Sequence, residues 1–357
     1  MTGKIMGRKM PGLSRGERAA DFVLPLEGGT PTRFYARAGG RSTLLIFGGA
    51  EPVGKLLHFA EALHAGLSGD VPIFAVQRTG QEADSQTTPE DKFAIPVFSD
   101  IQGKVRTLYR LDAEEKTIIF VLDANLRVLA SLYLDDTEAT MQEVISLLDS
   151  ALPPEEPLEI VTQAPVLLIP NLLDAAMCQN LIDVWHNQGS EETGVEQSLE
   201  GRRQEALSPE LKRRRDHIVK DKELMKLLTS TIGRRLMPEV QKAFAFRATR
   251  FEGFKIVCYD AASGGFFHAH RDNLSPATAH RRFALTLNLN MDYEGGYLRF
   301  REYGPHLYRP DTGCGLVFSC SHLHEVTEVT KGRRFALLSF LFREVDMTAS
   351  RAKPKNG

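Results

Sequence analysis

The chain has 357 residues, of which 42% are apolar and 25% are charged, and its formal net charge is −2. This composition is typical of an ordinary globular protein, and the length favours two domains over a single core. No run of about eighteen apolar residues is present, so we expect no transmembrane helix. The near-neutral charge gives no reason to expect nucleic acid or a membrane as a partner.

Residues 1–15 are basic but lack the apolar core of a secretory signal, so they predict a flexible leader. The spacing of the four cysteines fits neither a disulfide framework nor a C-x-x-C site. We expect them to be small buried residues in a reducing compartment, and we therefore predict a cytoplasmic protein.

Residues 16–152 alternate between strand-like and helical patterns. The apolar runs STLLIFGGA and VPIFAVQ flank the helical pattern KLLHFAEALHAGL. KTIIFVLDANLRVLASLYL then predicts two strands joined by a turn, and EATMQEVISLLDSAL predicts a final helix. This order indicates a thioredoxin-like α/β domain.

The same region resembles the peroxiredoxin branch of that fold in GERAADFVLPLEGG, FSDIQGKVRTLYRL and IIFVLDANLRV. A peroxiredoxin needs a thiolate at the start of its first long helix, where the helix dipole and a nearby Arg lower the thiol pKa. The corresponding loop reads FGGAEPVGKL, and no cysteine precedes Cys178. We therefore expect no peroxidase or thiol–disulfide chemistry here, and the domain is left with packing, substrate presentation or homodimer formation as its role.

The Pro- and acid-rich residues 153–164 predict an extended linker to a second domain at 165–346, which is followed by a tail at 347–357. The second domain opens with a helix whose predicted N-cap is Asp174 and whose predicted end is Gly189.

Two further segments precede residues 254–342, which are predicted below to form a β-barrel. The polar residues 188–211 indicate a loop, either a lid at the barrel mouth or a surface insertion. Residues 211–246 indicate two helices, with the basic run from Lys212 to Arg215 on a solvated helix face.

Residues 254–342 alternate runs rich in Phe, Val, Leu and Ile with Gly/Asn/Asp turns, which predicts a double-stranded β-helix, or jelly roll. His270 and Asp272 share one side of a strand because they are two residues apart, and His324 lies on a later strand. Two histidines and one carboxylate form a facial triad that suits non-haem Fe(II) and leaves positions open for substrate and O2.

Other histidines compete for these roles. His268 could pair with His270 in an H-x-H arrangement that also suits zinc or copper, and His322 has the same strand parity as His324. Arg334 follows His324 by ten residues, and this spacing favours His324. A buried Arg beside an iron site implies a carboxylate ligand, because a guanidinium binds carboxylates bidentately and keeps its charge.

The segment resembles the Fe(II)- and 2-oxoglutarate-dependent dioxygenases of the prolyl 4-hydroxylase type. The matching features are Tyr259, the motif G-x-F-x-x-H-x-D from Gly265, the strand LTLNLN with YEGGYLRF, and H-x-V-x-x-V-x-x-G-x-R from His324. Members of this family decarboxylate 2-oxoglutarate to succinate and CO2 and use O2 to hydroxylate a C–H bond.

The resemblance implies two sets of site residues and no catalytic side chain beyond the metal centre. The implied Fe(II) ligands are His270, Asp272 and His324. The implied 2-oxoglutarate-binding residues are Arg334 and Tyr259, with Thr286 and Asn288 on the adjacent strand. Ascorbate is a further cofactor that the family leads us to expect.

The sequence departs from the family pattern at two places. Glu328 replaces a usual Pro, and Ala261, Ala262 and Ser263 lengthen the loop after Tyr259. Asp272 favours hydroxylation over halogenation, because related halogenases replace this carboxylate with a small residue. The substrate remains open among a peptidyl residue, an amino acid and a small metabolite.

Two other functions compete with the oxygenase. One is a non-catalytic metal-binding jelly-roll module with a redoxin-like interaction domain, which would leave Arg334 without a purpose. The other is a redoxin-type antioxidant enzyme, which lacks its cysteine.

Overall fold

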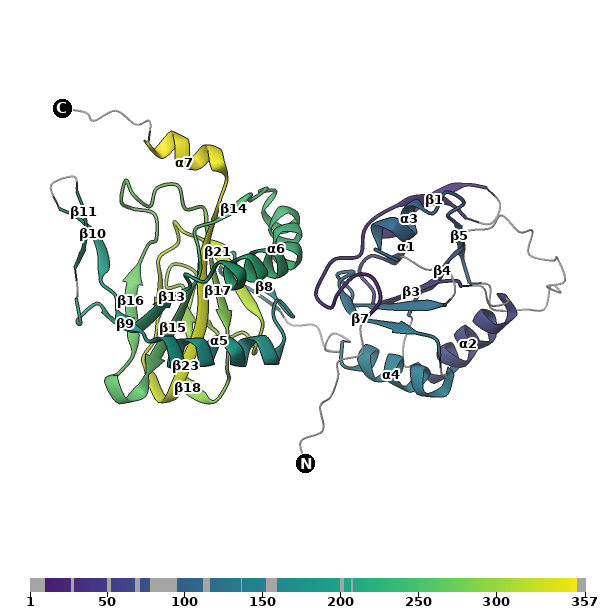
Figure 1. Cartoon of the computed structure of the whole chain (residues 1–357), viewed down its shortest axis with the longest axis horizontal. Coiled ribbons are helices and arrows are strands. Elements are labelled where there is room, and N and C mark those ends of the chain that lie inside the picture. Colours follow the sequence, from purple (N-terminus) through teal and green to yellow (C-terminus); the bar gives the residue numbers. More distant parts are fainter. Residues whose placement is uncertain are drawn as a thin grey trace. The chain divides into compact units, whose positions relative to one another are not determined.

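The computed structural model describes residues 10–26, 29–49, 53–67, 71–77, 95–111, 116–135, 137–151, 159–199, 202–206 and 208–351. Parts of the predicted leader, linker and tail therefore lie outside the described residues. The chain divides into two compact units, Met1–Pro157 and Leu158–Gly357. Figure 1 shows the chain and labels elements of both units. No helix in the described ranges is long and apolar enough to cross a membrane.

The first unit is built on a five-stranded sheet of order β5-β4-β3-β6-β7. Its strands are β3 (Thr43–Phe47), β4 (Ile73–Gln77), β5 (Val97–Ser99), β6 (Ile118–Leu122) and β7 (Val128–Tyr133). Strands β3, β4 and β5 are parallel, whereas β6 and β7 run antiparallel to their neighbours. A separate hairpin joins β1 (Val23–Pro25) and β2 (Pro31–Arg33), and the helices are α1 (Phe34–Ala38), α2 (Val53–Gly66), α3 (Lys104–Leu108) and α4 (Thr137–Asp149).

Both faces of this sheet are buried, which explains why its strands are continuously apolar. Successive side chains of β3 alternate between the faces: Leu45 and Phe47 belong to one core cluster, and Leu44 and Ile46 to the other. The predicted thioredoxin-like α/β class is confirmed. Of the loop FGGAEPVGKL, residues 50–52 lie outside the described ranges.

The second unit contains two antiparallel sheets that pack face to face. The major sheet has the order β8-β21-β17-β23-β15-β13-β9, with β14 and β18 pairing with β23. Its strands are β8 (Leu167–Ile169), β9 (Glu191–Glu192), β13 (Arg215–Ile218), β14 (Arg250–Phe251), β15 (Lys255–Asp260), β17 (Phe283–Asn288), β18 (Tyr293–Gly295), β21 (Gly315–Ser319) and β23 (Val329–Phe342).

The minor sheet has the order β12-β16-β22-β19-β20. Its strands are β12 (Lys212–Arg213), β16 (Phe266–His270), β19 (Leu298–Arg299), β20 (Leu307–Tyr308) and β22 (His324–Val326). One core cluster joins Val257 and Ala336 of the major sheet to Leu298 and Val326 of the minor sheet. The predicted double-stranded β-helix is therefore confirmed.

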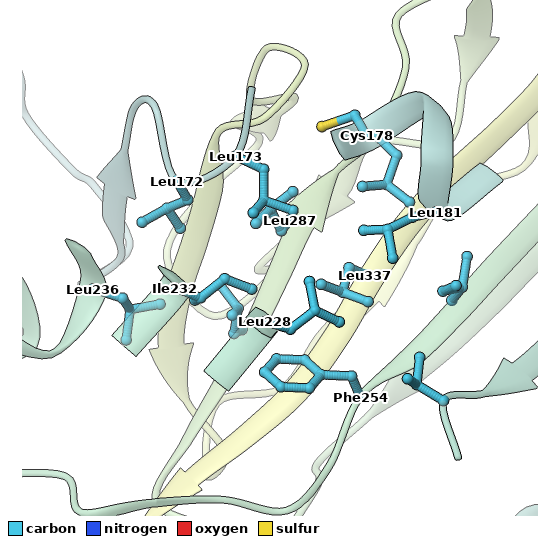
Figure 2. Packing of buried hydrophobic residues seen from close by; sticks show 14 of the residues in the cluster. Leu172, Leu173, Cys178, Leu181, Leu228, Ile232, Leu236, Phe254, Leu287 and Leu337 are labelled. Atoms are coloured by element: carbon cyan, nitrogen blue, oxygen red, sulfur yellow. The ribbon is translucent and has the colours of Figure 1, made fainter. Parts of the chain in front are cut away.

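Helices α5 (Ala175–Gln188) and α6 (Lys222–Phe244) cover the other face of the major sheet. Figure 2 shows Leu181 of α5 and Leu228 of α6 beside Leu287 and Leu337 of the sheet. Because side chains alternate along a strand, the residues next to these leucines point to the inner face, between the two sheets. The helices thus fix which face of β17 and β23 is left for a site.

The N-terminus of α5 is capped as predicted. The Asp174 carboxylate accepts a 2.7 Å hydrogen bond from the Met177 amide, and Gly189 follows the last turn. The remaining helical elements are the 3-10 turn η1 (Ala261–Ser263) and α7 (Glu344–Arg351).

Two predictions about the outer segments are wrong. Residues 211–246 form β12, β13 and a single helix, α6, instead of two helices; α6 begins after its N-cap Asp221 and contains Pro238. The polar loop predicted at 188–211 contains β9 and a hairpin of β10 (Val195–Leu199) and β11 (Arg202–Ala206), which projects from the unit beside β9 (Figure 1). Polar composition had concealed these strands, because charged and polar residues predominate from Gln188 to Asp216 and leave no alternation of apolar residues to indicate a strand.

Candidate metal centre

Strands β16 and β22 of the minor sheet bring two histidines side by side. The Cα atoms of His270 and His324 are register partners, and the ring centroids are 4.3 Å apart. Asp272 follows β16; its Oδ1 lies 3.6 Å from His270 Nε2 and its Oδ2 lies 3.4 Å from His324 Nε2. One ligand atom from each residue lies within 4.8 Å of the others. This spacing suits a single ion, since ligands at about 2.1 Å from a metal are about 3 Å apart when adjacent.

The second ring nitrogen of each histidine is held by a backbone carbonyl. His270 Nδ1 lies 2.8 Å from the carbonyl oxygen of His268, and His324 Nδ1 lies 3.0 Å from that of His322. A carbonyl only accepts hydrogen bonds, so Nδ1 carries the proton and Nε2 keeps its lone pair. Bonds of this kind orient metal-binding imidazoles. Both lone pairs are thus available where the Asp272 carboxylate lies.

The protonation states are those that a metal requires. Burial lowers the pKa of His324 to about 4, so the ring is neutral at neutral pH. Burial alone would raise the pKa of Asp272, but the two histidines and the Arg281 guanidinium hold it at about 2. A deprotonated carboxylate and a neutral imidazole bind a divalent cation without first losing a proton.

The rival histidines stay outside the cluster. The His268 ring packs on Phe266 with centroids 4.4 Å apart, and the His322 ring packs on Tyr303 at 5.2 Å. Both contribute their main-chain carbonyls, which orient the rings of the two cluster histidines. Within the described part of the chain, His270, Asp272 and His324 are the one group of three or more such side chains able to hold a metal.

A cavity of about 960 Å³ lies between the triad and the major sheet. Its lining includes the three clustered residues and, from the major sheet, Tyr259, Thr286 and Arg334. A volume of this size lies near the upper end of the range for small-molecule sites. The cavity therefore has room for more than a metal ion.

Arg334 is the unusual group in this cavity, because it is only 3% exposed and carries no ion pair within the described ranges. Its Nη2 reaches Thr286 Oγ1 at 3.5 Å, whereas Nε and Nη1 are buried without a hydrogen-bond partner among the described residues. Unfilled donors on a buried charge cost free energy unless a ligand fills them. A carboxylate fits, since it accepts two parallel bonds from one guanidinium.

Tyr259 lies next to Arg334 and is 2% exposed. The Arg334 guanidinium carbon lies 5.5 Å from the centre of the Tyr259 ring, and the Tyr259 hydroxyl accepts a 3.1 Å hydrogen bond from Arg214 Nη1. The structure thus brings Tyr259, Thr286 and Arg334 together opposite the metal triad.

Comparison with known proteins agrees with this geometry. Residues 254–342 match the family model of the 2OG-Fe(II) oxygenase superfamily. The second unit carries a 2OG-Fe(II) oxygenase domain. The resemblance of this segment to Fe(II)- and 2-oxoglutarate-dependent oxygenases is thereby confirmed. No curated protein sequence matches the chain.

Several solved structures are similar to parts of the chain. A prolyl-4-hydroxylase from Pseudomonas putida has 17% identity and a TM-score of 0.38, with 51% of this chain and 94% of that chain covered. A prolyl hydroxylase from Trichoplax adhaerens, bound to a hypoxia inducible factor peptide, has 18% identity and a TM-score of 0.42, with coverage of 53% and 88%. A Chlorobium tepidum protein described as thiol:disulfide interchange protein DsbE has 22% identity and a TM-score of 0.32, with coverage of 38% and 99%.

Asn288 does not join the site of this oxygenase domain. Its amide nitrogen donates to the carbonyls of Asn290 and Pro310 at 2.8 and 3.0 Å, and its Oδ1 accepts from the Tyr293 hydroxyl at 3.2 Å. It is also absent from the cavity lining. These contacts do not support the predicted role at 2-oxoglutarate, because the side chain already ties the loops that follow its strand.

The prediction that the run from Lys212 to Arg215 lies on a solvated helix face is wrong. Lys212 and Arg214 line the cavity, and Asp216 is buried beside them. Burial alone would raise the pKa of Asp216, but the charge of Arg214 lowers it. The signal that could have revealed this arrangement is the alternation of residues 212, 214 and 216, which has the period of a strand and not of a helix.

Proposed function

We propose that this protein is an Fe(II)- and 2-oxoglutarate-dependent dioxygenase that hydroxylates a C–H bond and releases succinate and CO2. The substrate would be a peptidyl residue, an amino acid or a small metabolite. One observation carries the proposal: a metal-binding triad and a buried Arg334 with unfilled donors face the same cavity. A metal-binding module without a cosubstrate would have no use for that arginine.

The residues fit this metal and this cosubstrate. His270, Asp272 and His324 would hold one face of the iron, which when bound supplies the O2 chemistry of the superfamily. Arg334 would receive the distal carboxylate of 2-oxoglutarate, with Tyr259 and Thr286 as hydroxyl partners.

The charges also balance. One negative charge on Asp272 and two on 2-oxoglutarate match the positive charge of Arg334 and the two charges of Fe(II). A neutral assembly is favourable in a cavity whose groups are largely removed from water.

Room for a substrate lies beyond these groups. The cavity extends along Phe267, Leu338 and Phe340 to Lys255 and Arg281. Arg281 is already paired with Glu252 through its Nε at 2.7 Å, so the charge of this arginine is compensated. Apolar walls with a few placed polar groups are typical of sites that enclose an organic molecule.

The test requires no knowledge of the substrate. Fe(II) and then 2-oxoglutarate are added to the anaerobic protein, and we expect the visible metal-to-ligand charge-transfer band of the chelate. His324→Ala should abolish the band. Iron binding without a band would favour the non-catalytic metal-binding module, and a failure to bind iron would refute the triad.

Three further properties stay predictions from the sequence. They are the use of ascorbate, a cytoplasmic location and dimerisation through the thioredoxin-like unit. Ascorbate dependence is checked by adding it to a 2-oxoglutarate turnover assay.

A further inference from the structure

Arg214 lies at the crossing point between the two sheets of the oxygenase domain. It separates β12, which pairs with β16, from β13, which pairs with β15. Strand β16 carries His270 and strand β15 carries Tyr259. Arg214 is therefore placed on the wall that joins the metal-binding side of the cavity to the Tyr259 side.

A buried carboxylate fixes the Arg214 side chain. Arg214 Nε donates to Asp216 Oδ1 at 2.6 Å, and Nη2 donates to Oδ2 at 2.7 Å. The Asp216 side chain is fully buried and also accepts from the Thr193 hydroxyl. A bidentate pair of this kind fixes the plane of the guanidinium. The remaining group, Nη1, donates to the Tyr259 hydroxyl at 3.1 Å.

This contact decides what the Tyr259 hydroxyl is able to do. A phenol has one donor and two acceptor positions, and a guanidinium has no acceptor. Arg214 therefore fills an acceptor position, and the hydroxyl proton of Tyr259 must go elsewhere. Within the described ranges, no residue accepts that proton. The hydroxyl hydrogen of Tyr259 is therefore available to a ligand in the same cavity as the two unfilled donors of Arg334.

We infer that Arg214 is a positioning residue for 2-oxoglutarate, which holds Tyr259 so that its hydroxyl donates to the distal carboxylate beside Arg334. The inference rests on the proposed function. Arg214 does not bind the carboxylate itself, because Asp216 occupies its two parallel donors and balances its charge. Its effect on the distal carboxylate passes through Tyr259, since its other ring contact, 5.6 Å from the centre of Phe267, is with the residue that stacks on His270.

The test compares dissociation constants for 2-oxoglutarate, measured by calorimetry on the full chain loaded with Mn(II) in place of iron. The variants are Arg214→Gln, Tyr259→Phe and the double variant. We expect each single variant to bind about tenfold more weakly, which corresponds to one hydrogen bond to a charged group. The double variant should bind no more weakly than Tyr259→Phe, because Arg214 acts only through that hydroxyl.

Two controls separate this role from a structural one. Arg215→Gln changes the next residue, whose exposed guanidinium bonds to Ser190 instead of lining the large cavity, and it should bind normally. Pyruvate, which lacks the distal carboxylate, should bind equally to the wild type and to Arg214→Gln. If Arg214→Gln does not fold because Asp216 is left unpaired, the Arg214→Gln/Asp216→Asn variant takes its place.

The outcomes are distinguishable. Unchanged 2-oxoglutarate affinity in Arg214→Gln, multiplied losses in the double variant, or an equal loss for pyruvate would overturn the role of Arg214 and leave the oxygenase proposal standing. A metal-loaded wild type that does not bind 2-oxoglutarate would overturn both.

Discussion

Arg334 and Tyr259 are Cα partners across β23 and β15, and the next pair in the register is Arg333 and Asp260. The two pairs point to opposite faces of the sheet. On the outer face, Arg333 Nε donates to Asp260 Oδ2 at 2.8 Å. On the inner face the partner of Arg334 is a tyrosine, and no carboxylate among the described residues pairs with the guanidinium. The two adjacent arginines thus differ: Arg333 has its carboxylate partner within the chain, whereas Arg334 has donors left for the proposed 2-oxoglutarate.

This difference predicts the effect of changing each arginine. Arg334→Gln should weaken the binding of 2-oxoglutarate by about 10- to 100-fold, since a bond to a charged group is worth about 1.5–3 kcal/mol. Metal affinity should not change. Arg333→Gln is the matched control and should bind 2-oxoglutarate normally. Calorimetry on the Mn(II)-loaded variants measures both, and equal losses in the two variants would contradict the assignment of Arg334.

Substitution of His322 and of His324, the two histidines of the H-L-H segment, should affect metal binding differently. His324→Gln should lose tight Fe(II) or Mn(II) binding, because it removes one of three ligand atoms. His322→Gln should retain it, because His322 orients the ligand ring through its main-chain carbonyl, which the substitution leaves in place. Metal titration followed by electron paramagnetic resonance of Mn(II) checks the pair. Retained affinity in His324→Gln would exclude it as a ligand.

His324 should also make the stability of the metal-free protein depend on pH. Its folded pKa, about 4, lies below the ordinary value of 6.5, so the unfolded chain binds the proton more readily. The free energy of unfolding should therefore fall as the pH is lowered from 6.5 to 4, by up to about 3 kcal/mol from this group. Scanning calorimetry of the metal-free wild type and His324→Gln at pH 7 and 5 tests this. The variant should lose less stability, and equal losses would show that His324 does not titrate in this way.

Much of the fold followed from side-chain periodicity. Alternating strand-like and helical runs predicted the thioredoxin-like α/β unit, and the i, i+2 spacing predicted that His270 and Asp272 face one cavity, although Asp272 lies just past the end of β16. The cap at Asp174 was predictable because its carboxylate needs only the amide three residues along. These features depend on local sequence alone.

The missed features depend on the partners of each segment. Thr286 and Asn288 have the same strand parity, yet only Thr286 lines the cavity, because the amide of Asn288 is used by the following loops. The charge of Arg214 looked solvated because a sequence does not show that it pairs with Asp216 in the interior. Periodicity predicts which face of a strand a side chain occupies. It does not predict which residues near the end of the strand bond to neighbouring loops instead of facing the cavity.

A glycine beneath Arg334 should prove as important as the arginine. A Cβ at Gly296 would lie 2.8 Å from Val329 Cγ2 and 3.1 Å from Arg334 Cδ, so the arginine stem would have to move. Gly264 is the matched control, because its φ of +59° resembles the +61° of Gly296 while its Cβ would meet only the ends of the Glu328 and Arg213 side chains. Gly264→Ala should cost about 1–2 kcal/mol from backbone strain alone.

Gly296→Ala should cost more stability than the control, and it should also weaken the binding of 2-oxoglutarate while leaving metal affinity intact. The reason is that it displaces the carboxylate-binding guanidinium and not the triad on the facing sheet. Thermal unfolding and calorimetric titration of the two alanine variants separate the effects. If Gly296→Ala binds 2-oxoglutarate as tightly as Gly264→Ala, the position of the Arg334 stem does not control the carboxylate site.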